Sequence, residues 1–328
     1  MRMYGLDRFN LNFRKYLLFW AFSSMVIGYL AGKFNHERVV GLEFIITPLL
    51  FLMVFIMVLP TRLASLLQLS SYLYPMIVSF ILFLISPFLS YIVSLIIPEN
   101  FNYLRTGIVV ASTVPPDAML SAWAGFFEAD ILLTLIIQSF TFLMWIFLVP
   151  FGLSLFFGGT PYYSVWVLVN NLLILIVIPF LAGGLIKFFL KRWVKEKHLN
   201  NFKPTLSTIS GLIELFILLI SVALSASIIS ENPVIILWGV LTSALYYFMS
   251  FVISISLALL FSLPFEYAIP VVYQNGSKNL GLGLVVALTS FKNQAVLGVA
   301  ACVLAQLPIS SVFYTFISRF EQRRRIVK

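Results

Sequence analysis

Apolar runs of about 18 residues or more recur along the whole chain. Of its 328 residues, 61% are hydrophobic and 10% are charged, and the mean hydropathy is +1.03. Soluble proteins carry roughly 25% charged residues. The buried core of a soluble enzyme could account for one or two such runs. A chain built from them is typical of an all-α polytopic membrane protein.

The apolar runs predict ten transmembrane helices. Several are longer than the roughly 20 residues that cross a bilayer, so we expect tilted helices. In chain order the predicted spans cover about 16–33, 39–60, 74–97, 104–126, 130–158, 163–190, 206–229, 233–262, 266–290 and 294–318.

The distribution of lysine and arginine tests the number of predicted spans and their orientation in the membrane. With a cytoplasmic N-terminus, sixteen of the 21 lysines and arginines face the cytoplasm. Lys33, Arg38, Arg105 and Lys292 face outward, and Lys278 lies within the membrane. This asymmetry predicts a multi-pass cell-membrane protein with both termini in the cytoplasm. The net charge of +9 then reflects loops next to an anionic inner leaflet, and nucleic acid is not an expected partner.

The most basic stretch, 187–203, separates five spans from five. An odd number of spans in each half forces the halves into opposite orientations, so a repeat must be inverted. We assign residues 1–190 to the first five-helix repeat together with span six, and residues 191–328 to the remainder of the second repeat.

Spans four and nine are each the fourth of their half, and both are interrupted by polar, helix-breaking strings. The strings are Ser112-Thr113-Val114-Pro115-Pro116-Asp117-Ala118-Met119 and Gln274-Asn275-Gly276-Ser277-Lys278-Asn279. Hydrocarbon cannot hydrogen-bond a broken backbone, so such breaks survive where protein or a wet cavity shields them. Paired breaks in corresponding places of two halves indicate the binding site of a secondary transporter.

Each break carries one charge at a similar depth. Asp117 follows Arg105 by twelve residues and Lys278 follows Glu266 by twelve. At about 1.5 Å per residue both lie roughly 18 Å from their own face, near the middle of a core about 30 Å thick. Pairing would offset the energetic cost of burying the two charges. The pair is either a permanent structural salt bridge or, as we favour, a proton-coupling pair.

The other residues of the breaks supply backbone and side-chain ligands. Pro115 and Pro116 lack N–H donors, so they leave backbone carbonyls one turn earlier without helical partners, and a new helix N-terminus begins after Asp117. Gly276 permits unusual dihedrals. Glu214, about eight residues into span seven, either lines the inner vestibule or bonds neighbouring helices. The candidate substrate or ion site comprises Pro115, Pro116, Asp117, Gln274, Asn275, Ser277, Lys278 and Asn279, with Glu214 and Gln138 as weaker members.

No catalytic, metal or cofactor site is predicted. The single cysteine, Cys302, lies in an apolar run, and His36 and His198 fall in connecting loops. A membrane-embedded enzyme would need a nucleophile with a base, paired carboxylates or a histidine-rich site. The candidate carboxylates lie on distant spans, so the sequence favours a transporter of a small molecule or ion over an enzyme.

Several strings match a known family of carriers. Pro115-Pro116-Asp117-Ala118-Met119 with Trp123, and Asp130 with Leu133-Thr134-Leu135 and Gln138, fall in spans four and five. Phe265-Glu266-x-Ala268, Ser277-Lys278-Asn279 and Leu307-Pro308 fall in the second half. These strings resemble the bile acid:sodium symporter superfamily, and specifically its arsenite-efflux branch. The resemblance implies a panel domain of spans one, two, six and seven, and a core domain of spans three to five and eight to ten.

The departures from the family bear on the cargo. Pro116 stands where the arsenite carriers have a membrane cysteine, and trivalent arsenic favours soft sulfur ligands. Sodium-coupled members carry a Glu-x-Gly-x-Gln-Asn string, which aligns with Gln274-x-Gly276-x-Lys278-Asn279 and places an ammonium where sodium would bind. We therefore expect either proton coupling or uncoupled uniport of a small anionic or oxyanion-like solute, and we favour proton coupling. An arsenite or antimonite efflux permease, a sodium-coupled organic anion symporter, an auxin-efflux-type carrier and a channel are the alternatives.

Overall fold

The computed structural model describes residues 16–58, 63–117, 119–157, 164–193, 196–291 and 293–327. Most of these residues lie in helices, and they contain no strand, apart from one isolated antiparallel bridge between Pro116 and Lys278. An all-helical, strongly apolar chain is what the sequence predicts for a polytopic membrane protein. The lysine and arginine side chains in 1–15 and 187–203, which determine the predicted orientation, lie outside the described residues.

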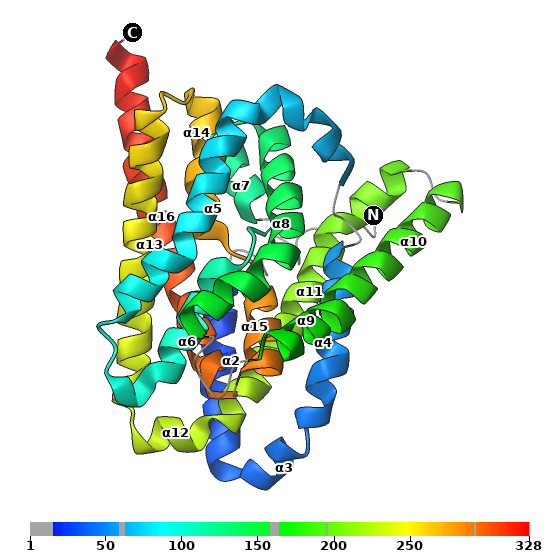
Figure 1. Ribbon diagram of the computed structural model, residues 1–328, viewed down its shortest axis with the longest axis vertical. Coiled ribbons are helices and arrows are strands. Elements are labelled where there is room, and N and C mark those ends of the chain that lie inside the picture. The colour runs from blue at the N-terminus through cyan, green and yellow to red at the C-terminus, as the bar shows by residue number, and fades with distance from the viewer. Residues whose placement is uncertain are drawn as a thin grey trace. The chain divides into compact units, whose positions relative to one another are not determined.

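The chain divides into two compact units (Figure 1). The first unit contains Met1–Thr61, Thr160–Pro233 and Leu284–Val296, and the second contains Arg62–Gly159, Val234–Gly283 and Leu297–Lys328. Helix α15 (Leu280–Ser290) passes from the second unit into the first, and the short turn η5 (Asn293–Ala295) follows it.

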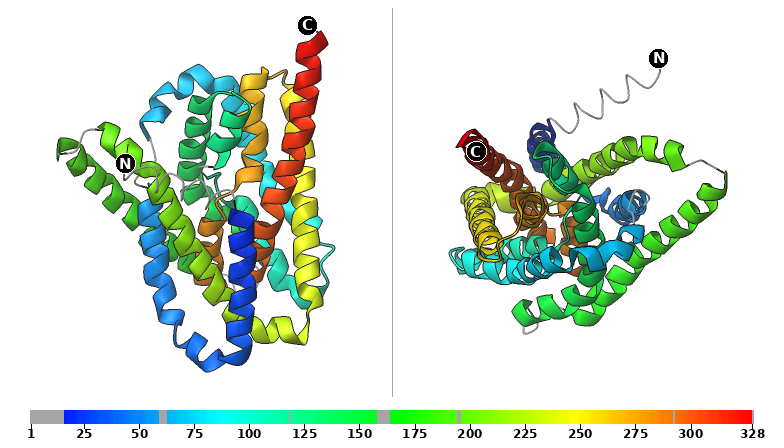
Figure 2. Two further views of the ribbon diagram at one scale, coloured as in Figure 1. Left: turned by 180° about the vertical axis from the view of Figure 1, so that it is seen from behind. Right: turned by 90° about the horizontal axis from the view of Figure 1, so that it is seen from above.

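The first unit is built around the long helix α11, which packs against α2 and α4 (Figure 2). Gly28 and Gly32 of α2 permit this packing, because a Cβ atom on either would collide with the backbone carbonyl of Leu219 or Ala223. Small residues four apart allow such close approach of membrane helices. The helices of this unit are α2 (Leu17–Phe34), α3 (His36–Val40), α4 (Glu43–Val58), α9 (Val165–Leu172), the π-helical turn η3 (Leu173–Val177), α10 (Ile178–Trp193), α11 (Glu196–Leu224) and α12 (Ala226–Glu231).

The second unit pairs α5 with α13 and packs α14 against α7, α8 and α13 (Figure 1). A cluster that includes Trp123, Tyr273, Phe251 and Phe313 fills its core. Its helices are η1 (Leu63–Tyr72), α5 (Leu73–Ser94), η2 (Glu99–Phe101), α6 (Asn102–Thr113), α7 (Met119–Phe126), α8 (Ile131–Phe157), α13 (Val234–Leu260), α14 (Phe265–Tyr273), η4 (Asn275–Ser277) and α16 (Val296–Val327).

Within the described residues, four helices are long and apolar enough to cross a bilayer. They are Leu67–Ser94, Ile131–Phe157, Val234–Leu260 and Val296–Phe320. Shorter apolar helices lie at Phe44–Ile56, Val165–Leu175, Thr208–Leu224 and Leu280–Ser290, the last being one half of an interrupted span. The count of ten spans stays a prediction.

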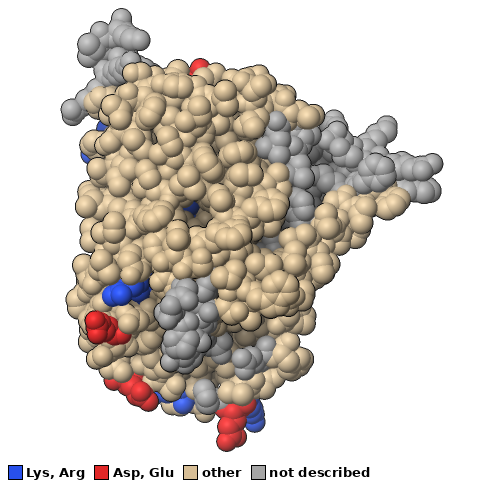
Figure 3. All heavy atoms as spheres, in the orientation of Figure 1, with Lys and Arg blue, Asp and Glu red and all other residues tan. Residues whose placement is uncertain are grey.

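The outer surfaces of these helices are apolar. On α8, Phe147, Phe151 and Leu155 recur every fourth residue and are 66%, 69% and 73% exposed. In a soluble protein such an exposed apolar stripe would pack against a partner, whereas in a membrane protein it is suited to face lipid. On the face shown in Figure 3, most charged atoms lie along the margins, and a small recessed blue patch interrupts the broad uncharged surface.

Candidate functional site

The first interrupted helix breaks where the proline pair predicts. Helix α6 ends at Thr113, Val114 is extended, and α7 begins at Met119. Because Pro116 has no N–H group, the carbonyl of Ser112 lacks its ordinary helical donor. The hydroxyl of Ser86 on α5 donates to that carbonyl at 2.9 Å. The carbonyl released by the break is thus hydrogen-bonded inside the protein, as a break at membrane depth requires.

The second interrupted helix breaks at Gln274–Asn279, also as predicted. Helix α14 ends at Tyr273, one 3-10 turn follows, and Lys278 is extended before α15 begins at Leu280. The hydroxyl of Ser310 on α16 donates to the carbonyl of Gly276 at 2.8 Å. A neighbouring helix therefore supplies the missing donor here as well.

The two breaks lie against each other and are joined through their backbones. Pro116 and Lys278 form the antiparallel bridge. Two hydrogen bonds flank it, from the Asp117 N–H to the Ser277 carbonyl at 2.8 Å and from the Asn279 N–H to the Pro115 carbonyl at 2.9 Å. Segments about 160 residues apart in the sequence thus satisfy each other's backbone groups.

Each residue after the bridge caps the helix that follows. The carboxylate oxygen Oδ1 of Asp117 accepts a hydrogen bond from the N–H of Met119 at 2.8 Å, at the start of α7. The amide oxygen Oδ1 of Asn279 accepts from the N–H of Leu282 at 3.2 Å, at the start of α15. Asp and Asn are both strong N-cap residues. Asp117 and Asn279 therefore hold equivalent positions in the two breaks.

Glutamine side chains on two further helices donate hydrogen bonds to the backbone of the two breaks. Gln138 of α8 donates its amide to the carbonyl of Asp117 at 2.6 Å, and Gln306 of α16 donates to the carbonyl of Lys278 at 3.2 Å. The hydroxyl of Tyr247 on α13 donates to the Gln306 amide oxygen at 3.0 Å. Gln138 was predicted from the sequence as a site residue, whereas Gln306 was not. An amide side chain in the apolar run of the tenth predicted span was the available signal.

The side-chain amide of Gln274 forms hydrogen bonds with α5. Ser79 donates its hydroxyl to the Gln274 side-chain oxygen at 2.7 Å, and the Gln274 side-chain nitrogen donates to the Ser79 carbonyl at 2.9 Å. Within the described residues, Asn275 Oδ1 and Ser277 Oγ are buried without a hydrogen-bond partner. A buried polar atom without a partner is costly, so these two oxygens are suited to bind a ligand or water.

The place where the two breaks meet, at the bridge between Pro116 and Lys278, is called the crossing below. Lys278 is buried there, with 1% of its surface exposed. Its ammonium lies 5.3 Å from the centroid of the Phe83 ring on α5. A cation over an aromatic face gains stabilisation that increases with desolvation. The crossing therefore contains an ammonium group and, through Asp117, a carboxylate from the segment on the opposite side of the bridge.

Gly276 has a different role from the one predicted. Among the described glycines none has a positive φ, so Gly276 is not required for an unusual backbone conformation. A Cβ atom at this position would collide with the ring of Phe251 and approach Ser310 Oγ to 3.0 Å. The glycine is needed because α13 and α16 come too close for a side chain.

Most of the predicted site residues come together in the second unit. These are Pro115, Pro116, Asp117, Gln138, Gln274, Asn275, Ser277, Lys278 and Asn279, while Ala118 lies outside the described residues. Glu214 lies on α11 of the first unit, and its part in the site stays a prediction. Cys302 is fully buried on α16, with Sγ 3.4 Å from Ser243 Oγ. Among the described residues no His, Cys, Asp and Glu cluster could hold a metal ion.

Comparison with known proteins shows the family of the chain. The sequence model of the Sodium Bile acid symporter family matches residues 47–232, more than half of the chain. The chain is also 22% identical to the uncharacterized protein YbaS of Bacillus subtilis (strain 168) over 307 residues, which cover 93% of this chain and 98% of that protein. Members of the family are transporters of ions or small molecules and not enzymes. The chain therefore belongs to the sodium/bile acid symporter family of membrane transport proteins.

Proposed function

We propose that this protein is a secondary active transporter that moves a small anionic or oxyanion-like solute across the cytoplasmic membrane, coupled to protons through Asp117 and Lys278. The observation that carries the proposal is the backbone bridge between Pro116 and Lys278, which joins two interrupted helices. Interrupted helices with buried polar groups are typical of the binding sites of alternating-access carriers.

The proposed architecture has ten spans in two inverted five-helix repeats, with both termini cytoplasmic. Asp117 and Asn279 each cap the helix that follows their break, and Gln138 and Gln306, from the next predicted span of each half, each donate to a backbone carbonyl of a break. These equivalences support an internal repeat. We propose that the first unit forms the panel and the second forms the core, with Leu284–Val296 of predicted spans nine and ten clustering in the first unit, and that the two units move during transport.

The proposed coupling uses both charges of the crossing. A carboxylate at Asp117 balances the Lys278 ammonium when the site is empty. A proton that binds the carboxylate removes this balance, and the ammonium then binds the anionic solute. Release of the proton on the other side restores the balance and displaces the solute. A buried charge left without compensation is unfavourable, so proton and solute bind together.

Sodium-coupled organic anion transport is the second candidate, favoured by the family to which the chain belongs. Two features weigh against it. Gln274 stands where the sodium-coupled members carry a carboxylate, and its amide is already bonded twice to Ser79. Lys278 adds a positive charge to the same segment. Arsenite efflux is less well supported, because Pro116 replaces the membrane cysteine and Cys302 is fully buried.

Transport by purified protein in proteoliposomes tests the proposal. We would impose a pH gradient and a sodium gradient separately, follow proton movement, and screen anions and arsenite. A solute that drives proton flux in the wild type, but not in Asp117→Asn or Lys278→Gln, is the expected result. Glu231→Gln, an exposed acid at the end of α12, is the matched control and should transport normally. Sodium-driven flux in the wild type would refute proton coupling, and a flux that neither saturates nor shows counterflow would indicate a channel.

A further inference from the structure

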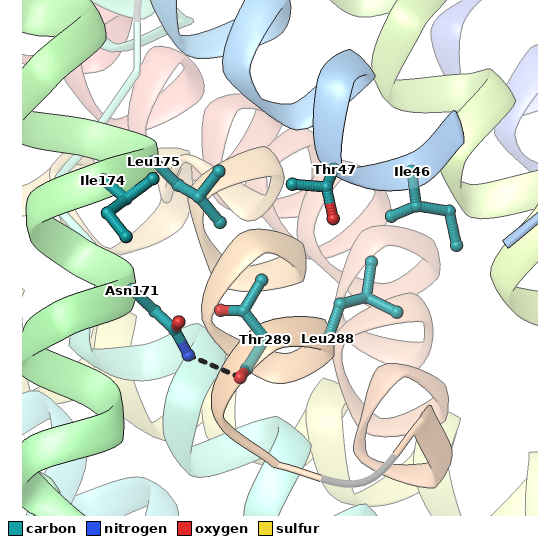
Figure 4. Close-up of a pocket in the computed structure, with 7 residues that line it drawn as sticks. All are labelled: Ile46, Thr47, Asn171, Ile174, Leu175, Leu288 and Thr289. Atoms are coloured by element: carbon teal, nitrogen blue, oxygen red, sulfur yellow. Dashed lines mark hydrogen bonds between the residues drawn. The ribbon is translucent and has the colours of Figure 1, made fainter. Parts of the chain in front are cut away.

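A cavity of ≈ 340 Å³ lies within the first unit, and none of its lining residues belongs to the site predicted from the sequence (Figure 4). Its volume is at the lower end of the range of about 300–1,000 Å³ that is typical of pockets for small organic ligands. Its lining residues come from α4, from the junction of α9 with η3, and from the end of α15: Ile46, Thr47, Asn171, Ile174, Leu175, Leu288 and Thr289.

Each of the three walls contains a helix irregularity. Pro48 lies inside α4, directly after Thr47. The π-helical turn at Leu173–Val177 widens the helix that carries Ile174 and Leu175. Such turns are frequent at functional sites. The third wall is the last turn of α15, whose final carbonyls have no partner within the helix.

Asn171 joins two of these walls. Its amide nitrogen donates to the carbonyl of Thr289 at 2.5 Å and lies 3.3 Å from Ser290 Oγ. The first of these bonds, drawn in Figure 4, satisfies one of the terminal carbonyls of α15. Asn171 therefore positions the end of α15 and contributes a polar side chain to the cavity.

The chemistry of the lining is uncharged and mainly aliphatic. Ile46, Ile174, Leu175 and Leu288 contribute hydrocarbon, whereas Thr47, Asn171 and Thr289 contribute two hydroxyls and one amide. Figure 4 shows Ile174 and Leu175 on one side of the cavity and Thr47 with Ile46 across from them. None of the seven lining side chains is charged, so an ionic group that entered would lose hydration without gaining a partner.

We propose that this cavity binds the uncharged, aliphatic part of an organic solute that the protein carries. The hydrocarbon body packs against the isoleucine and leucine side chains. A hydroxyl or amide N–H of the solute donates to the Asn171 side-chain oxygen or to the Thr289 hydroxyl oxygen, because the Thr289 hydroxyl already donates to the Val285 carbonyl and the Asn171 amide nitrogen to the end of α15. A carbonyl of the solute accepts from the Thr47 hydroxyl. The identification of this ligand as cargo rests on the proposed transport function, but the binding itself does not. An inorganic oxyanion offers neither a hydrocarbon body nor an uncharged group, and so does not fit this cavity.

Protection of an introduced thiol from chemical labelling tests the site without any measurement of flux. Thr47→Cys places a thiol in the cavity wall, and the parent protein supplies the background, because Cys302 is fully buried. N-ethylmaleimide labelling would be timed in proteoliposomes with isovaleramide, with 3-methyl-1-butanol, or with isovalerate. Isovalerate has the shape of isovaleramide but carries a charge. We expect the two uncharged probes to slow labelling severalfold and isovalerate to have little effect.

Two further variants test whether the polar side chains of the cavity contribute to the protection. Asn171→Leu and the isosteric Thr289→Val, each combined with Thr47→Cys, should weaken protection by isovaleramide. No protection by either uncharged probe, or equal protection by isovalerate, would overturn the proposal. Protection that is unchanged in both variants would show that these polar side chains do not bind the probe, and would also overturn the proposal. Failure of proton-coupled flux would leave these labelling results unaffected, so the two proposals fail separately.

Discussion

The side-chain amide of Gln306 donates a hydrogen bond to the backbone carbonyl of Lys278 at 3.2 Å. Gln306 is buried, and its own amide oxygen is held by the hydroxyl of Tyr247. The position of the lysine backbone is therefore fixed from α16 and α13 together. Gln138 makes the same type of bond to Asp117 from α8.

Replacing Gln306 by leucine should destabilise the protein and disturb transport. The variant removes the donor to the Lys278 carbonyl and the amide acceptor of the Tyr247 hydroxyl, and an unsatisfied buried group costs about 1–3 kcal/mol. We expect Gln306→Leu to lower the thermal midpoint in detergent and to alter the pH profile of flux. Ser311→Ala removes an exposed hydroxyl on the same helix and should change neither. A normal pH profile in Gln306→Leu would mean that this bond does not position Lys278.

Asp117 has two roles that substitution can separate, the cap of α7 and the charge of the crossing. Asp117→Asn keeps the cap, because asparagine is as good an N-cap as aspartate, whereas Asp117→Ala removes both cap and charge. We expect Asp117→Ala to lose about 0.5–2 kcal/mol of stability and Asp117→Asn to lose little. Proton-coupled flux should vanish in both. Proton-coupled flux in Asp117→Asn at the wild-type level would leave Asp117 with the capping role alone.

The positions of both breaks could be predicted from the sequence because they depend on local chemistry. A proline pair cannot continue a helix, and a charged polar string inside an apolar run has no place in lipid. The bridge between Pro116 and Lys278 could not be predicted, because it depends on the packing of segments about 160 residues apart. The same holds for Gln306 and Ser79, whose roles follow from which helices are neighbours.

Gly276 shows why a local interpretation can fail. From the sequence, a glycine in a polar string indicates an unusual dihedral. In the structure its φ is negative, and the reason for the glycine is the ring of Phe251 on α13, 25 residues earlier in the chain. The cavity of the first unit was also not predicted. Its polar residues, Thr47, Asn171 and Thr289, are single side chains in three separate apolar runs.

Gly276→Ala should therefore destabilise the second break. The added methyl group would collide with Phe251, and overpacking of a tight core costs about 1–3 kcal/mol. Gly152→Ala is the matched control, since a Cβ atom at Gly152 of α8 meets nothing within 4 Å. We expect Gly276→Ala alone to lower the thermal midpoint, and Phe251→Leu to restore part of the loss. A midpoint equal to that of Gly152→Ala would show that the ring moves aside without cost.

Introducing the string of the sodium-coupled members tests whether Gln274 and Lys278 make this chain independent of sodium. The double variant Gln274→Glu with Lys278→Gln produces the Glu-x-Gly-x-Gln-Asn pattern at the second break. It exchanges an amide for a carboxylate beside Ser79 and removes the ammonium, so that oxygen ligands and a negative charge are available to a hard cation. We expect solute flux in this variant to become sodium-stimulated, whereas flux in the wild type and in Lys278→Gln alone does not respond to sodium. Thermal stability in detergent, measured with and without sodium, provides an independent readout, because a cation that binds the folded state raises the midpoint. If the wild type is itself stabilised by sodium, the ammonium of Lys278 does not take the place of the cation, and proton coupling through Asp117 and Lys278 is refuted.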